Sequence, residues 1–261
     1  MSGKKTLIFI DIDGTLLRPD YKPNSSAVPA LIKKLSKKDY IFSLNSNRAT
    51  HDLVSVAKKF GITGPLIGEN GVFVREKGKE RKLVNVRRIE KILEPILQKL
   101  AQENGAKILR MDTVRNGKEK KSHTGATWLV NRFREYTASI HVRNNGMRDV
   151  RAARSLAQKL RKALPNSYAV TVSSIFANVL VSPRSMDKGK AAAKLRKTSF
   201  PSSRIVMIGD DDADAPMIRV ADAFYAVGNA SKALKKRATF SAKRPYTQGV
   251  AEILRAIDSD S

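Results

Sequence analysis

The sequence LIFIDIDGT, residues 7–15, joins an unbroken apolar run to two acidic residues and a glycine. Four consecutive apolar residues, Leu7–Ile10, are typical of a β-strand that is buried on both faces, as in a parallel sheet. Similar runs recur at Ile41–Leu44 and Ile205–Ile208. Because segments with helical spacing of apolar residues separate these runs, the sequence predicts an α/β fold with a Rossmann-like parallel-sheet core.

The pattern changes in the middle of the chain. Lys77–Lys82 is charged, and it predicts a turn at a domain boundary. We expect residues 1–79 and 186–261 to form one discontinuous core domain, with residues 80–185 inserted as a smaller α+β domain. Asn116–Ser122 in this insert is polar and rich in lysine, so we expect a loop there. The expected strands of the insert are Thr137–Val142, Tyr168–Val172 and Ala177–Val181.

The composition limits the possible classes of protein. The 261 residues are 41% hydrophobic and 28% charged, which is ordinary for a globular protein. No apolar run approaches the ~20 residues that a membrane-spanning helix needs. The chain contains no cysteine, which excludes disulfides and thiolate metal sites and fits a cytoplasmic location. The sequence does not determine an oligomeric state.

The net charge of +26 is unusual, and residues 80–185 hold about half of the excess, with 22 basic and 8 acidic residues. Such a charge attracts anions, among them phosphorylated metabolites and nucleic acids. The alternative is a solvated basic surface without a specific partner. No nucleic-acid motif is present and only 6% of the residues are aromatic, so nucleic acid is the less favoured partner.

Polar clusters follow each of the three apolar runs. The residues after these runs are Asp11 and Asp13, then Ser46, Asn47 and Arg48, then Asp210 to Asp214. Because ligands of open parallel sheets bind outside the carboxyl ends of the strands, we expect the three loops to converge. Several carboxylates in one crevice repel one another unless a cation lies between them, and an all-oxygen ligand set favours Mg²⁺.

Other side chains of these loops suit a phosphate group. The Ser46 hydroxyl can donate a hydrogen bond to a phosphoryl oxygen, Lys188 can neutralise its charge, and Gly14 permits close approach of the backbone. Two of these assignments have alternatives. Ser46 could instead be the N-cap of a helix, and Lys190 could take the place of Lys188 at the phosphate. For Arg48, two alternatives are open: it binds the substrate, or its role is purely structural. Together these residues predict a phosphate site with a nucleophile, an acid/base and a metal.

The four clusters resemble, in order and spacing, the motifs of the haloacid dehalogenase-like (HAD) superfamily. Asp11-Ile-Asp-Gly-Thr15 matches the first motif, Ser46 the second, Lys188 the third and Asp210…Asp214 the fourth. An insert between the second and third motifs resembles the superfamily's C2 cap. This arrangement is shared by Cof-like, sucrose-phosphate, mannosyl-3-phosphoglycerate and archaeal phosphoglycolate phosphatases.

The resemblance implies a role for each motif. Asp11 attacks phosphorus and becomes an aspartyl-phosphate, and Asp13 protonates the leaving oxygen and then activates water. Mg²⁺ is held by Asp11, by the backbone carbonyl of Asp13 and by Asp210, with Asp214 in support. The expected substrate is a small phosphorylated metabolite, either a sugar phosphate or a phosphorylated acid such as phosphoglycolate. A phosphomutase on the same scaffold is an alternative, and a basic nucleic-acid-binding protein with a vestigial site is another.

Two positions depart from the family pattern. Ser46-Asn47-Arg48 stands where Thr-Gly-Arg is usual, and the hydroxyl is kept. Ala213 stands where the fourth motif usually has asparagine, which removes a polar contact near the metal and leaves Asp211 or Asp212 as a substitute.

Overall fold

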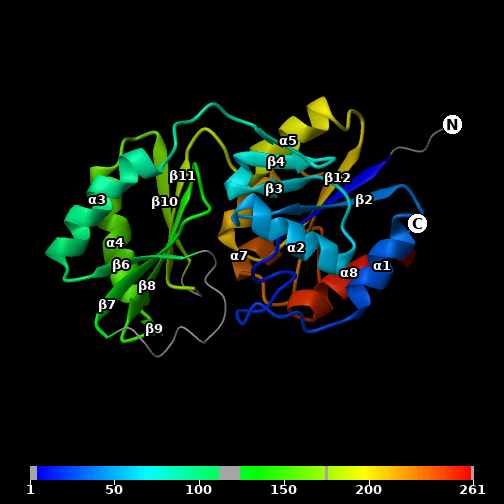
Figure 1. Cartoon of the computed structure of the whole chain (residues 1–261). Helices are drawn as coiled ribbons and strands as arrows, with labels where there is room; N and C mark the ends of the chain where they lie inside the picture. The colour runs from blue at the N-terminus through cyan, green and yellow to red at the C-terminus, as the bar shows by residue number, and fades with distance from the viewer. Residues whose placement is uncertain (1–4, 112–123, 174–175, 260–261) are drawn as a thin grey trace. The chain divides into compact units, whose positions relative to one another are not determined.

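The computed structural model describes residues 5–111, 124–173 and 176–259. The loop expected at Asn116–Ser122 lies outside them. The chain divides into two compact units (Figure 1). The first unit consists of Met1–Leu83 and Met186–Ser261, and the second of Val84–Ser185.

An eight-stranded sheet forms the centre of the first unit, in the order β14-β13-β12-β1-β2-β3-β4-β5. Its strands are β1 (Thr6–Ile10), β2 (Tyr40–Asn45), β3 (Leu66–Gly68), β4 (Phe73–Glu76), β5 (Lys79–Lys82), β12 (Arg204–Gly209), β13 (Ala223–Ala226) and β14 (Phe240–Ser241). The strands from β14 to β3 are parallel, and β4 and β5 are antiparallel additions. The predicted α/β fold with a parallel-sheet core is therefore confirmed.

Helices cover both faces of this sheet. Side chains of α1 (Ala27–Leu35), α2 (Thr50–Phe60) and α8 (Tyr246–Ser259) share one hydrophobic cluster with Ile8 and Ile10 of β1. On the opposite face, Asn45 of β2 donates a hydrogen bond of 3.0 Å to the Lys188 carbonyl oxygen at the start of α5 (Lys188–Thr198). Two short helices complete the unit, α6 (Ala215–Ile218) and α7 (Lys232–Lys235). Burial on both faces explains why β1 is apolar throughout.

The expected turn at Lys77–Lys82 is wrong in its second half. Lys77 and Gly78 have positive φ angles of 49° and 79°, as in a tight hairpin turn, and β5 follows them and pairs with β4. All four residues of β5 are exposed, so this edge strand lacks the apolar alternation by which strands are usually recognised. The first unit consequently continues to Leu83, four residues beyond the boundary expected from the sequence.

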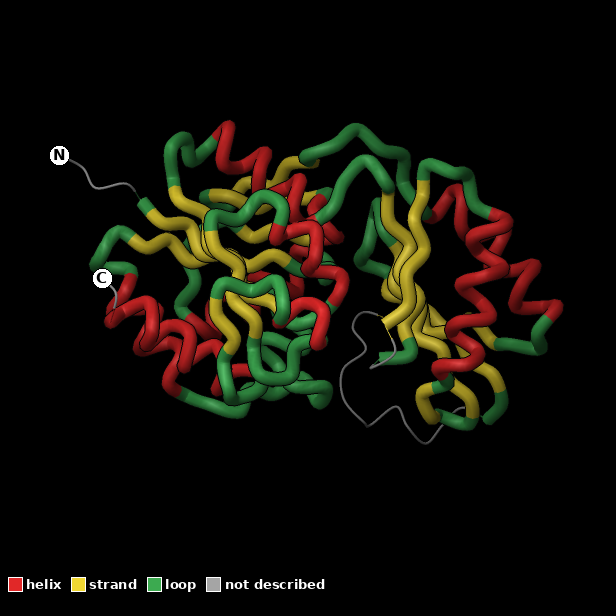
Figure 2. The backbone as a smooth tube through the Cα atoms, turned by 180° about the vertical axis from the view of Figure 1, so that it is seen from behind, coloured by secondary structure: helices red, strands yellow, loops and turns green. Residues whose placement is uncertain are grey.

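The second unit is a sheet with helices on one of its faces (Figure 2). Its main strand order is β10-β11-β8-β7-β6, and β9 pairs with β8. Buried residues of both helices and of the sheet form one hydrophobic core, which includes Trp128. The strands are β6 (Lys107–Met111), β7 (Ala126–Asn131), β8 (Ala138–Asn144), β9 (Met147–Arg148), β10 (Tyr168–Ser173) and β11 (Asn178–Pro183), and the helices are α3 (Glu90–Glu103) and α4 (Val150–Ala163). Among the described residues, no helix is long and apolar enough to cross a membrane.

Candidate active site

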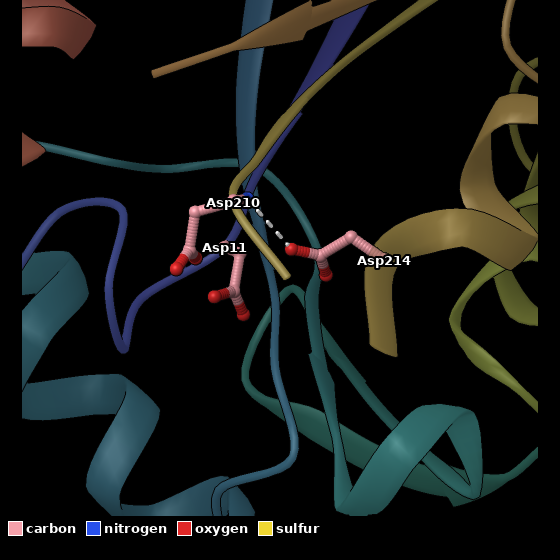
Figure 3. Close-up of side chains that lie close together, drawn as sticks. All are labelled: Asp11, Asp210 and Asp214. Atoms are coloured by element: carbon pink, nitrogen blue, oxygen red, sulfur yellow. Dashed lines mark hydrogen bonds between the residues drawn. The ribbon is translucent and has the colours of Figure 1, made fainter. Parts of the chain in front are cut away.

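Three buried carboxylates meet at the carboxyl ends of β1 and β12. Asp11 follows β1, Asp210 follows β12, and Asp214 ends the short 3₁₀ turn Asp212–Asp214 (Figure 3). One oxygen of each carboxylate lies within 4.8 Å of the others, and each residue is at most 5% exposed. Because β1 and β12 are adjacent parallel strands, their ends bring residues 11 and 210 together although 199 positions separate them.

The ammonium group of Lys188 lies between two of these carboxylates. Its Nζ is 2.6 Å from Oδ1 of Asp11 and 2.6 Å from Oδ1 of Asp214, and the residue is 2% exposed. Asp187 caps α5 by accepting a hydrogen bond from the Lys190 backbone amide, which fixes the start of the helix. The Lys190 side chain is half exposed, and its Nζ lies 3.8 Å from Oδ2 of Asp187. The structure therefore brings Lys188, and not Lys190, to the carboxylate cluster.

The electrostatics of this cluster favour a bound cation. Burial raises the pKa of Asp11 to about 7, against the attraction of the Lys188 ammonium. Burial also raises the pKa of Asp210 above its ordinary value, and the charges of Asp11 and Asp214 add to that rise. Burial alone lowers the pKa of Lys188, but the two carboxylates outweigh it and raise the pKa. When all three carboxylates are ionised, they and the ammonium have a net charge of −2, which a divalent cation balances.

The donor atoms also suit a hard divalent cation. The cluster offers carboxylate oxygens alone, and Mg²⁺ prefers oxygen ligands. The side chain of Asp13 does not belong to this cluster, and the contact expected between the metal and the Asp13 backbone carbonyl stays a prediction. The residues present thus fit the metal that the family pattern implies.

Two glycines make room for the carboxylates. A Cβ atom at Gly14 would collide with the Asp210 carboxylate, and one at Gly209 would collide with that of Asp214. Gly14 also has a φ angle of 95°, which other residues rarely adopt. Asp214 accepts a hydrogen bond of 3.0 Å from the backbone amide of Asp210 (Figure 3), which places it as a support of the Asp210 loop.

Asp13 lies outside the buried cluster, in an ion pair with Arg48. Arg48 donates two hydrogen bonds to the carboxylate, of 2.8 Å from Nε and 2.6 Å from Nη2. The amides of Thr15 and Leu17 donate to the Ile12 carbonyl, so the chain turns after β1 and directs Asp13 to the loop that follows β2.

The second motif lies at the end of β2. Ser46 is 1% exposed, and its hydroxyl accepts a hydrogen bond of 3.3 Å from the Arg48 amide. The alternative role of Ser46 as a helix N-cap is wrong, because α2 begins at Thr50 with Ala49 at its N-cap position. Asn47, which lies between Ser46 and Arg48 in the sequence, is half-buried. In the fourth motif, Ala213 is exposed.

Three polar residues support the site without being predicted from the sequence. Thr15 donates a hydrogen bond of 2.8 Å to Oδ1 of Asp210, and Asn229 donates one of 2.8 Å to the Gly14 carbonyl. Asn45 holds the first turn of α5 through the Lys188 carbonyl. Thr15 belongs to the first motif, so a hydrogen bond from its hydroxyl to a nearby carboxylate could have been predicted from the sequence. Asn229 and Asn45 act through contacts across 215 and 143 positions, which no local pattern reveals.

The sequence also matches a family model, described as haloacid dehalogenase-like hydrolase, over residues 8–254. The chain belongs to the haloacid dehalogenase-like hydrolases. This confirms the family resemblance of the four motifs, and the match includes every residue of the site.

Similar proteins extend over the whole chain. A phosphoglycolate phosphatase of Staphylothermus marinus is 26% identical over 96% of this chain and 97% of its own length. A crystal structure from Thermoplasma acidophilum superposes with a TM-score of 0.74 at 20% identity, covering 98% of this chain and 99% of that one. A sugar phosphatase of HAD subclass IIB superposes with a TM-score of 0.68 at 14% identity, covering 97% and 99%. At these identities, the two structures support the fold alone.

Proposed function

We propose that this chain is a Mg²⁺-dependent phosphatase that hydrolyses a small phosphorylated metabolite in the cytoplasm through an aspartyl-phosphate at Asp11. The reaction class, hydrolysis of a phosphoric monoester, follows from the family and from relatives that are named phosphatases. The observation that carries the finer proposal is the buried Asp11 carboxylate, which lies beside Lys188 and within 4.8 Å of Asp210 and Asp214.

Asp11 is suited to act as the nucleophile. Its Oδ1 accepts the hydrogen bond from Lys188, and this bond fixes the orientation of the carboxylate. The second oxygen would attack phosphorus: a bond from Oδ2 to phosphorus forms, and the bond from phosphorus to the leaving oxygen breaks. Hydrolysis of the resulting acyl phosphate would regenerate the carboxylate and release inorganic phosphate.

Asp11, Asp210 and the backbone carbonyl of Asp13 would hold Mg²⁺, with Asp214 in support. When bound, the ion supplies positive charge that reduces repulsion between the carboxylate and the phosphate dianion. Lys188 would add a second positive charge on the same side of the phosphoryl group. The side chains of Ser46, Asn47 and Arg48, together with the backbone at Gly14, would contact the remaining phosphoryl oxygens or the substrate.

Asp13 would serve as the acid and base. Its carboxylate is more accessible than that of Asp11, with 27% of the side chain exposed, so it can reach a leaving group. It would give a proton to the leaving oxygen in the first step and take one from water in the second. The two hydrogen bonds from Arg48 restrict the position of this carboxylate before substrate binds.

Phosphoglycolate is the first substrate to test, because the relatives that match over the whole chain carry that activity in their names. Other phosphorylated acids and sugar phosphates follow. A phosphomutase would instead transfer the phosphoryl group to a second hydroxyl of the substrate, so release of inorganic phosphate separates the two reactions.

The test is a screen of these compounds with Mg²⁺, measuring inorganic phosphate. Asp11→Asn should lower turnover by a factor of at least about 10⁴, because an amide is a poor nucleophile. Asp39→Asn is the matched control: Asp39 is exposed, and its positive φ of 64° suits asparagine. The control should keep full turnover. If Asp11→Asn were as active as the control, Asp11 would not be the nucleophile.

The nucleic-acid-binding alternative makes a different prediction. Salt-dependent retention on nucleic acid without any turnover would favour this alternative.

A further inference from the structure

An open groove of about 530 Å³ lies in the first unit beside the start of α8. Three of its lining side chains are cationic, namely Lys243, Arg244 and Arg255. The catalytic carboxylates do not line it. Ser25, Gln248, Ala251 and Glu252 also line the groove.

The spacing along α8 produces one wall of the groove. Gln248, Ala251, Glu252 and Arg255 are three or four positions apart, so they lie on one face of the helix. Ala251 is only 1% exposed and carries a small side chain, which leaves space between its longer neighbours. This face therefore presents a recess with polar and cationic edges.

The groove is preformed by hydrogen bonds on both sides. The Glu252 carboxylate accepts from the backbone amides of Lys243 and Arg244, at 3.0 and 3.1 Å. On the other side, the side-chain oxygen of Asn24 accepts from the Gln248 amide at 3.1 Å, next to Ser25. Both walls are thus fixed to α8 before any ligand binds, which lowers the entropic cost of binding.

The charges of the groove are available to a ligand. Glu252 lines the same groove and keeps its negative charge, and its two oxygens accept hydrogen bonds from backbone amides. The side chains of Lys243, Arg244 and Arg255 are exposed, and none of the three forms an ion pair within residues 5–111, 124–173 and 176–259. The three cations and the Glu252 carboxylate give the recess a net charge of +2, which attracts an anion with more than one negative charge.

We propose that this groove binds a small polyanion that carries phosphate groups, at a site separate from the catalytic carboxylates. The arginine side chains supply forked donors that match phosphate oxygens, and Gln248 and Ser25 supply neutral hydrogen-bonding groups. The volume suits a small molecule. Among the described residues, none that lines the groove is aromatic, so they offer no surface on which a nucleic-acid base could stack.

Isothermal titration calorimetry with inorganic pyrophosphate in metal-free buffer of low ionic strength tests this proposal. One variant carries Arg244→Gln and Arg255→Gln. The matched control carries Lys59→Gln and Lys197→Gln, which remove the same charge from exposed positions on α2 and α5. Arg255→Gln alone serves as a milder variant if the double variant is unstable. The wild type should bind pyrophosphate at one site.

The groove variant should bind at least about tenfold more weakly than the wild type, and the control should change by less than about threefold. Absence of binding by the wild type would overturn the proposal. Equal weakening in both variants would show that only the overall charge matters, and unchanged affinity in the groove variant would place the anion elsewhere, for example at the catalytic site. Either result overturns it. Because the assay needs no turnover, its outcome is independent of the phosphatase proposal.

Discussion

Two groups of paired charges lie at the candidate active site, and they differ in burial. Lys188 is 2% exposed and is held between Asp11 and Asp214. The side chains of Arg48 and Asp13 are 17% and 27% exposed, and they form a two-bonded ion pair at the edge of the same site. The first group is built from the ends of buried strands and the start of a capped helix. The second is built from two loops.

This difference separates two requirements of the proposed reaction. A nucleophile and its charge partners need a fixed geometry in a dry environment, where electrostatic interactions are strong. An acid/base must reach a leaving group and then a water molecule, so it needs access. We therefore expect changes in the buried group to affect both stability and turnover, and changes in the exposed pair to affect mainly turnover.

Among changes to the charge partners of Asp11 and Asp13, the largest effect should follow replacement of Lys188. Lys188→Met keeps much of the volume but leaves Asp11 and Asp214 without their cation, which should reduce stability by about 3–5 kcal/mol. Loss of the charge beside the phosphoryl group should lower kcat/KM by roughly 10²–10³. Chemical denaturation and phosphate release measure the two effects. Lys190→Met, at the half-exposed neighbour, should change stability by less than about 0.5 kcal/mol. Comparable losses in both variants would remove the distinction between the two lysines.

A smaller effect should follow from Arg48→Lys. Lysine keeps the charge but cannot form both hydrogen bonds to Asp13, so the acid/base would be less well placed. We expect kcat to fall about tenfold with KM changed less, and stability to remain within about 1 kcal/mol. Arg75→Lys, at an exposed ion pair with Glu80 in the β4–β5 hairpin, is the control. A large rise in KM with kcat unchanged would instead assign Arg48 to substrate binding.

The smallest effect concerns pH and Mg²⁺. In the absence of metal, burial raises the pKa of Asp11 to about 7, whereas an unfolded aspartate has a pKa of about 3.9. Between these values the folded state binds more protons, so the contribution of Asp11 to stability falls as pH rises from about 4 to 7. Mg²⁺ needs the deprotonated carboxylate, and its stabilising effect should therefore grow over the same range.

Thermal unfolding with and without excess Mg²⁺ measures this linkage. At pH 7.5 the ion should raise Tm by about 5 °C, and at pH 5.5 the increase should be clearly smaller. Asp210→Asn should abolish most of the increase at pH 7.5. An equal increase at both pH values, or one that persists in Asp210→Asn, would place the Mg²⁺ site outside the carboxylate cluster.

The same contrast between buried and exposed regions determines how far the sequence predicts the structure. Buried strands such as Leu7–Ile10 have unbroken apolar runs, and their order along the chain predicts which loops converge on one edge of the sheet. The predicted convergence of Asp11, Asp210 and Asp214 follows from this physical constraint. Family patterns then supply the roles, because spacing alone does not separate a nucleophile from a metal ligand.

Exposed elements are much less predictable. β5 consists of four exposed residues, and β6 has exposed or half-buried side chains, so neither shows a buried face in its sequence pattern. The ion pair between Arg48 and Asp13 depends on how two loops turn after their strands. The hydrogen bond from Asn229 to Gly14 depends on a contact between distant segments. These features arise from tertiary packing and could not be derived from local residue patterns.

Chemical trapping at Asp11 tests the central claim most directly. The enzyme is mixed with its best substrate and Mg²⁺, quenched during turnover and treated with borohydride, which reduces an acyl phosphate to an alcohol. Peptide mass spectrometry should then find homoserine at position 11 in the wild type and no such product in Asp11→Asn. Asp13→Asn should increase the trapped fraction with an activated phosphate ester, because breakdown of the intermediate would be slowed. Wild-type turnover with an unmodified Asp11, or with the product at another aspartate, would contradict the proposed mechanism.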